Sequence, residues 1–344
     1  DATINHSNND TRTLSNKESY SDEATYLDRD STVKLTNSWD AQLRLEMEYQ
    51  IDSMNKLILR PQISYTNSHS NQTNDYIYDR DTVRINDGYQ LQESQSEEIK
   101  ASMRAIYNHK FAKPGRTITM RANLSFTNTK GNTDTYAWDN LQSLALVDQY
   151  TLSHNNALSY SLRTSYVEPI YGKNHFLEMV LSLSGNNRNS VKDQYTMDNL
   201  IGDYVYDYDF SNSLINNMYT EQVEMNYRWV SEKIDLTAGA RVLATQTYSK
   251  TYYGGILARD TLYNRWNWSP NVRFRYKFGQ KEFARIVYRG RVNQPTIQQM
   301  EPVRNNSDAM NETVGNLGLN PAFSHNIFAM YSKFNQEKFS SMMV

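Results

Sequence analysis

The sequence contains no cysteine. This absence excludes disulfides, iron–sulfur clusters and thiolate zinc sites. It also lacks a long hydrophobic run, since the longest lies near Leu144–Val147 and a membrane helix needs roughly 18 to 20 apolar residues. A helical membrane protein is therefore excluded. A membrane β-barrel is not, because only alternate residues of a barrel strand face lipid.

The sequence also lacks an excess of either charge. Its 36 Lys and Arg nearly balance 38 Asp and Glu, so we expect no nucleic-acid partner. The aromatic residues are mostly tyrosine, with 26 Tyr against 11 Phe and 5 Trp. Tyrosine suits a boundary between apolar and wet surroundings, such as a membrane interface or a sugar-binding surface. The chain begins at Asp1 without a signal peptide and stops at Val344 inside a predicted strand, which predicts a piece of a longer protein.

The main positive signal is a two-residue periodicity, clearest over 37–51. Trp39, Leu43 and Tyr49 fall on one face of a strand, whereas Arg44 and Glu46 fall on the other. A helix would spread these charges around its whole circumference. The segment therefore predicts a strand with one apolar and one polar face.

The same alternation predicts about twelve strands in six pairs. The pairs are 37–51 with 56–66, 97–108 with 116–127, 156–167 with 175–184, 219–229 with 234–245, 265–278 with 282–290, and 322–334 with 339–344. Short turns join the members of each pair. Long polar segments, which we interpret as loops, separate the pairs at 67–96, 128–149, 185–217, 246–264 and 291–320, and 1–33 forms another before the first pair.

These features favour an all-β fold, an antiparallel transmembrane β-barrel. Many strands reach the roughly 9 to 11 residues that a tilted span requires, and short periplasmic turns alternating with long outer loops are typical of such barrels. Aromatic residues mark both ends of the apolar face, as interfacial belts do. They are Tyr49, Tyr107, Tyr166, Trp229 and Phe278 near the short turns, and Trp39, Tyr65, Phe126, Tyr219 and Trp266 near the long segments. The alternative is a soluble barrel or sandwich with aromatic ladders.

Segment 291–327 resembles the TonB-dependent outer-membrane receptor superfamily, and most of all its Bacteroidetes outer-membrane β-barrel branch. The resemblance rests on Gln294-Pro295, Met300-Glu301-Pro302, Gly315-Asn316, Leu319-Asn320-Pro321 and Ser324-His325-Asn326. The segment departs from the pattern at Leu317 and Ala322, where the family usually has Pro and often has Glu.

The resemblance implies that residues 1–344 are part of one transmembrane barrel domain of about 22 strands, located in the outer membrane. It implies an N-terminal plug domain that this chain does not contain. It further implies import of a nutrient ligand (a siderophore, vitamin, glycan or peptide), energised by the TonB complex through that plug. The alternatives are a passive porin-like channel and a structural or adhesive surface barrel. Outer-membrane lipids are an expected partner in each case.

Two acidic segments are candidate ligand sites. In the predicted outer loop 203–210, the rings of Tyr204, Tyr206 and Tyr208 could stack on a sugar or flat chelate, and the carboxylates of Asp207 and Asp209 could hold a cation. The alternative is a solvated loop, or a strand extension with alternating tyrosines. Segment 74–87 also looks calcium-binding, with spacing unlike an EF-hand, and the alternative is again a solvated loop; its carboxylates are Asp75, Asp79, Asp81 and Asp87.

Basic residues share the inward parity of two neighbouring predicted strands. They include Arg273, Arg275, Arg285 and Arg289. We expect them to face the lumen, either as a contact surface for an acidic plug or anionic ligand, or as charges paired with carboxylates elsewhere in the barrel. The histidines are scattered and no nucleophile elbow occurs. We therefore expect no catalytic residues, no enzymatic activity, no metal and no cofactor.

Overall fold

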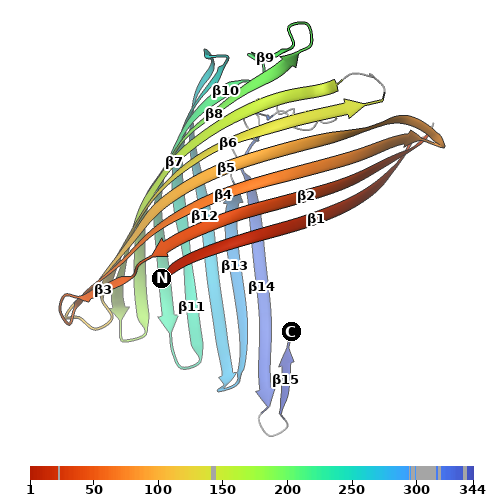
Figure 1. Cartoon of the computed structure of the whole chain (residues 1–344). Coiled ribbons are helices and arrows are strands. Elements are labelled where there is room, and N and C mark those ends of the chain that lie inside the picture. The colour runs from red at the N-terminus through yellow and green to blue at the C-terminus, as the bar shows by residue number, and fades with distance from the viewer. Residues whose placement is uncertain are drawn as a thin grey trace.

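The computed structural model describes residues 1–21, 24–140, 145–293, 295, 299, 315–316, 319–335 and 339–344, apart from the side chains at 145–146 and 335. Its strands form one 15-stranded sheet (Figure 1). The strands are β1 (Ala2–Tyr20), β2 (Thr25–Arg44), β3 (Met47–Gln50), β4 (Asn55–Arg80), β5 (Val83–Lys110), β6 (Thr117–Asp139), β7 (Ala145–Tyr171), β8 (His175–Asp198), β9 (Asp203–Tyr206), β10 (Asn212–Val230), β11 (Ile234–Tyr253), β12 (Ile256–Gly279), β13 (Glu282–Asn293), β14 (Ala322–Asn335) and β15 (Ser340–Met343).

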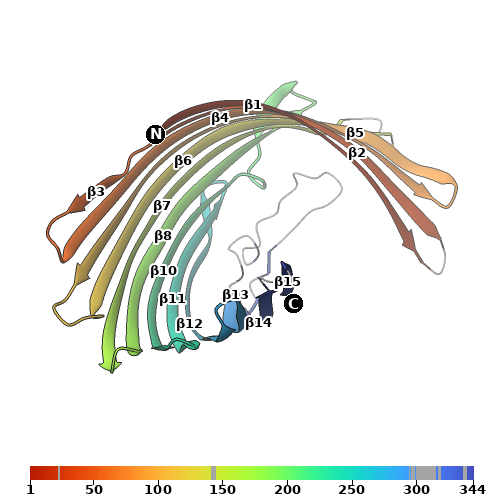
Figure 2. The same ribbon diagram turned by 90° about the horizontal axis from the view of Figure 1, so that it is seen from below.

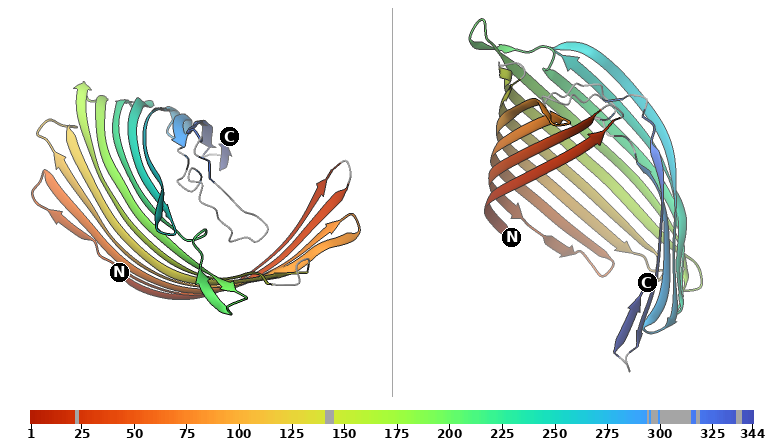
Figure 3. Two further views of the ribbon diagram at one scale, coloured as in Figure 1. Left: turned by 90° about the horizontal axis from the view of Figure 1, so that it is seen from above. Right: turned by 90° about the vertical axis from the view of Figure 1, so that its right-hand side faces the viewer.

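Neighbours in the sheet follow chain order and pair antiparallel from β1 to β15, while β3 pairs with β4 and β9 with β8. The sheet curves into a deep trough (Figures 2 and 3), and β1 and β15 form its two edges without pairing with each other. The predicted antiparallel barrel fold is confirmed, with the wall not closed. No helix among the described residues is long and apolar enough to cross a membrane.

The registers place apolar residues of neighbouring strands beside one another on one face, and polar residues beside one another on the other face. One row of cross-strand partners runs through Tyr107, Met120, Thr164, Leu181, Val223, Val242 and Trp268. Another row, on the opposite face, runs through Arg104, Asn123, Ser161, Ser184, Thr220, Thr245 and Arg265. The sheet therefore has one apolar and one polar face, because successive side chains of a strand point to opposite sides.

The polar face is the concave one. The Arg163 guanidinium of β7 lies 3.6 Å from the Glu224 carboxylate of β10, across the intervening β8. Asn271 of β12 and Asn226 of β10 likewise meet across β11 on this face, because the sheet curves toward it at this level. The apolar side chains of the convex face stay exposed, for example Leu181 at 52% and Val223 at 55%. Since exposed apolar belts are the lipid-facing surface of barrels, this belt is the membrane-spanning zone.

The prediction that the long polar segments are loops was wrong at most positions. β4 continues through Arg80 and β5 begins at Val83, so 67–96 is a hairpin with a turn at 81–82. Segment 1–33 likewise forms β1 and the start of β2, and strands cover most of 128–149, 185–217 and 246–264. Beyond a bilayer both faces of a sheet meet water, so the apolar alternation that reveals a strand disappears. Most of 291–320 lies outside the described residues.

Several strands continue well beyond the apolar belt at one end of the sheet, which we call the extended end. The strands are much longer than a membrane span: β4, β5 and β7 have 26, 28 and 27 residues, against the roughly 9 to 11 that a span requires. The other end has the short turns, which are periplasmic in outer-membrane barrels. We therefore expect the extended end, which is ordered sheet, to lie outside the cell.

Candidate binding surfaces

Four tyrosines gather on the convex side of the extended end; we call them the tyrosine patch. Tyr150, Tyr195 and Tyr206 are consecutive cross-strand partners on β7, β8 and β9. Ring centroids lie 6.3 Å apart for Tyr150 and Tyr195, 5.5 Å for Tyr195 and Tyr206, and 4.9 Å for Tyr206 and Tyr208. Edge-on and tilted aromatic pairs at these separations hold one another in place. The patch therefore offers ordered ring faces and edges.

Carboxylates border the tyrosine patch. The Tyr206 hydroxyl donates to Asp193 at 3.2 Å, and the Tyr204 hydroxyl donates to Asp148 at 2.6 Å. The bond to the Asp148 carboxylate raises the pKa of Tyr204 to about 12. Burial, with Glu93 and Asp148 nearby, raises the pKa of the Asp134 carboxyl. A hollow of about 490 Å³ lies here, and its lining includes Leu91, Glu93, Asp134, Tyr136, Asp148 and Tyr204.

The residues predicted in 203–210 are only partly brought together. Tyr204 and Tyr206 lie in β9, which matches the strand-extension alternative. The Asp207 carboxylate accepts hydrogen bonds from the backbone N–H groups of Asp209 and Phe210, at 3.1 and 3.2 Å. Asp207 therefore closes the following turn, while the Asp209 side chain is exposed. Among the described residues, no group of three or more His, Cys, Asp and Glu could hold a metal ion.

Tyr195 and Asp193 were missed because they fall in 185–217, which was interpreted as a loop, and Tyr150 was missed because it precedes the predicted strand 156–167. A signal was present: Asp193 and Tyr195 continue the parity of Leu181 and Leu183 along β8. Extending the two-residue period past the apolar belt would have placed them on the outer face.

Two carboxylates of segment 74–87, those of Asp79 and Asp87, lie within ion-pair distance of arginines. Asp79 accepts hydrogen bonds from Arg84, at 2.6 Å, and from Arg29. These contacts, that of Arg84 most of all, hold the pKa of the Asp79 carboxyl below its ordinary value. Asp81, at a φ of 53°, accepts the backbone N–H of Thr25 at 2.9 Å. Asp79 and Asp81 therefore fasten the hairpin tip and are not arranged as calcium ligands.

The basic residues singled out from the sequence lie on the concave face; we call Arg273, Arg275, Arg285 and Arg289 the basic wall. Arg275 on β12 lies directly opposite Arg285 on β13, and Arg289 is the partner of Asn271. The Arg275 guanidinium lies over the Phe283 ring at 4.0 Å, and its buried Nε has no hydrogen-bond partner. Within the described part of the chain, no ion pair joins these four arginines to a carboxylate.

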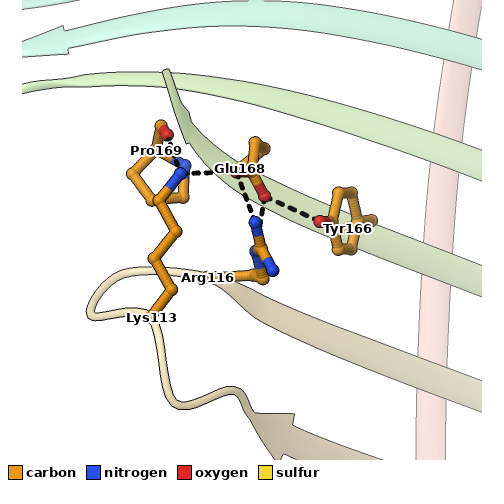
Figure 4. A network of polar contacts seen from close by, with 5 residues as sticks. All are labelled: Lys113, Arg116, Tyr166, Glu168 and Pro169. Carbon is orange, nitrogen blue, oxygen red and sulfur yellow. Dashed lines mark hydrogen bonds and ion pairs between the residues drawn. The ribbon is translucent and has the colours of Figure 1, made fainter. Parts of the chain in front are cut away.

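A polar network fastens the short-turn end (Figure 4). Glu168, near the end of β7, accepts hydrogen bonds from Arg116 Nε at 2.7 Å, Lys113 Nζ at 2.7 Å and the Tyr166 hydroxyl at 2.7 Å. Arg116, Lys113 and Tyr166, in that order, hold the pKa of the Glu168 carboxyl well below its ordinary value. The network ties the turn between β5 and β6 to β7, on the aqueous side of the belt.

A family model described as "Outer membrane protein beta-barrel family" matches residues 109–343. The chain belongs to this family. The predicted location in the outer membrane is therefore confirmed, and the exposed apolar belt is the part of this outer-membrane barrel that contacts lipid. No curated protein sequence matches the chain.

Two of the solved structures that resemble this outer-membrane barrel protein are autotransporter domains. The translocator domain of the autotransporter NalP from Neisseria meningitidis aligns with a TM-score of 0.30 and 11% identity, covering 84% of this chain and 81% of that one. The transport unit of the autotransporter AIDA-I from Escherichia coli aligns with a TM-score of 0.34 and 8% identity, covering 84% and 83%. Likenesses of this size assign no function.

The prediction of a TonB-dependent receptor was wrong. The family that matches, over a range that includes 291–327, is the Outer membrane protein beta-barrel family. The resemblance rested on Pro, Gly and Asn residues, which turns in unrelated proteins also favour. The implied nutrient import through a plug and a TonB complex, and the barrel of about 22 strands, fall with that assignment. Gln294, Met300-Glu301-Pro302 and Leu317 lie outside the described residues.

Proposed function

We propose that this protein is an adhesive surface barrel, which is anchored by its apolar belt and binds extracellular material at its extended end. The observation that carries the proposal is the ordered sheet beyond the belt. More than half of β4, β5 and β7 exceeds a membrane span. A protein that only formed a pore would need no such length of paired strand outside the bilayer.

The tyrosine patch is the proposed contact surface. Tyr150, Tyr195 and Tyr206 present aromatic rings beside Asp193, and Tyr208 is 67% exposed. Aromatic rings stack on the apolar faces of sugar rings, while carboxylates and phenols hydrogen-bond their hydroxyls. This chemistry favours a hydroxyl-rich polymer, such as a polysaccharide of the surroundings, as the bound material.

The test is adhesion of cells that carry the whole protein to surfaces coated with neutral polysaccharide, such as dextran or mannan. Replacing Tyr150, Tyr195 and Tyr206 together by Ala should reduce the number of attached cells about tenfold, as expected when about 1.4 kcal/mol of binding is lost. The matched control is Tyr171→Ala, because Tyr171 is 77% exposed at the short-turn end. Attachment no greater than that of cells without the protein would refute the proposal.

A passive channel is the second candidate. The polar row from Arg104 to Arg265 on the concave face favours it, because a wet lumen needs such a lining. Planar-bilayer recordings separate the two functions. Steady ion conductance without attachment to the coated surfaces would favour the channel.

A further inference from the structure

The concave face of β11 to β14 has a large excess of positive charge. Its cations include Arg241, Arg265, Arg273, Arg275, Lys277, Arg285, Arg289 and Arg291. Among the described residues of these four strands, Asp235 alone places a carboxylate on this face. That carboxylate already lies 3.9 Å from Arg228 of β10. Like charges directly opposite on neighbouring strands are destabilising, so the facing Arg275 and Arg285 favour an anion between or above them.

Apolar side chains alternate with these cations. Val287 and Phe328 follow Arg273 in one cross-strand row, and Met330 follows Arg275 and Arg285 in the next. Phe328 is 53% exposed although it lies on the concave side. An exposed phenylalanine is unfavourable in a lumen that holds only water. The surface therefore combines a carboxylate-binding character with an apolar one.

We propose that the basic wall is the docking surface of an acidic polypeptide segment that also carries apolar residues. Arginine forks bind carboxylates with paired hydrogen bonds. Arg273 and Arg275 are two residues apart on one strand, about 6.6 Å, which is also the spacing of alternate side chains in an extended peptide. An extended segment with acidic residues at two successive alternate positions, and an apolar residue at the next alternate position, directs all three side chains to the wall, because alternate side chains of an extended chain share one face. Such a segment matches both the charges and the position of Phe328. This inference does not depend on adhesion at the extended end.

The experiment uses the whole protein in detergent micelles and a fluorescein-labelled dodecapeptide with the repeat Glu-Ser-Glu-Ser-Val-Ser, in which Glu and Val share one face; we call it the Glu-Val peptide. We expect binding, measured by fluorescence anisotropy, that weakens as salt is raised. Replacing Arg273, Arg275, Arg285 and Arg289 together by Gln should weaken binding at least tenfold. The matched control replaces four arginines of the same face, Arg44, Arg104, Arg121 and Arg163, by Gln and should change binding less than twofold.

Two further measurements keep the proposal refutable. Phe328→Ser should weaken binding of the Glu-Val peptide about fivefold and leave binding of polyglutamate unchanged, so this variant tests the wall even if the fourfold variant does not fold. An oligouronate of equal charge should compete poorly. The proposal is overturned if the fourfold variants bind alike, if Phe328→Ser has no effect, or if the oligouronate competes as well as the peptide; the last result would identify a polysaccharide.

Discussion

Asn271 of β12 donates a hydrogen bond to Asn226 of β10, at 3.3 Å, across the strand that separates them. The contact passes over Gly239 of β11, where a Cβ would lie 2.1 Å from Asn226 Oδ1 and 2.4 Å from the Met225 carbonyl oxygen. A side chain at 239 would therefore collide with backbone as well as with the amide. The missing side chain lets the concave face curve inward here.

We expect Gly239→Ala to destabilise the protein by about 1 to 3 kcal/mol, the usual cost of overpacking. The measurement is urea unfolding in phospholipid vesicles, followed by tryptophan fluorescence. Gly279→Ala is the control, because nothing lies within 4 Å of a Cβ there. Equal unfolding midpoints for the two variants would show that the close approach is unimportant.

The apolar belt predicts a difference between adjacent residues of β10. Val223 faces outward and is 55% exposed, whereas Gln222 faces the concave side beside Glu224, at 3.2 Å. Val223→Arg should cost about 2 to 4 kcal/mol, as arginine does at the middle of a bilayer. Gln222→Arg adds the same side chain next to a carboxylate and should be nearly neutral. Vesicle-based unfolding free energies would show the reverse order if the faces were assigned wrongly.

The Glu168 network predicts a pH dependence. Its lowered carboxyl pKa means that the stabilisation is present above the unfolded value, about 4.3, and is lost as the pH falls toward the lower folded value. The difference in urea midpoint between the natural protein and Glu168→Gln should therefore be constant from pH 7 to about pH 5 and shrink at lower pH. Glu232→Gln, in an exposed turn, should show no such difference. A difference that grew on acidification would contradict the network.

The hairpin tip at 81–82 depends on Asp79. Asp79→Asn removes the carboxylate that Arg84 and Arg29 share, so we expect several-fold faster trypsin cleavage after Arg80 and Arg84. Membrane assembly should be unchanged, because the tip lies beyond the belt. Asp75→Asn is the matched control, since Asp75 is exposed on the same strand. Cleavage rates that match in both variants would mean that the ion pairs do not fasten the tip.

The sequence alone predicted the part of the fold that contacts lipid. Alternation around Val223 and Trp268 predicted their strands and their shared face, because a bilayer makes one face apolar. The alternation did not predict β1 or the parts of β4 and β5 at the extended end. Both faces meet water there, and Ser, Thr, Asn and Gln occur on either side. Hydrogen bonding along the ladder forms these strands without leaving a pattern of hydropathy.

The candidate sites were predicted less well, for a related reason. Tyr206 was singled out because it lies in a local run of tyrosines, whereas Tyr150 and Tyr195 reach it only through the registers of β7, β8 and β9. The charge of Arg275 was visible, but its position opposite Arg285 depends on pairing. Proximity between residues far apart in the chain was therefore what the sequence could not supply.

The long strands have a mechanical consequence. A load applied at the outer tip of the β4–β5 hairpin acts nearly along the strands and pulls β4 and β5 together, so the many hydrogen bonds that join β4 to β2 and β5 to β6 are strained together in shear. Opening from a free edge, by contrast, would break them one after another. Because the two strands have 26 and 28 residues, the sheet transmits a pull at the tip to the membrane-spanning part with little extension.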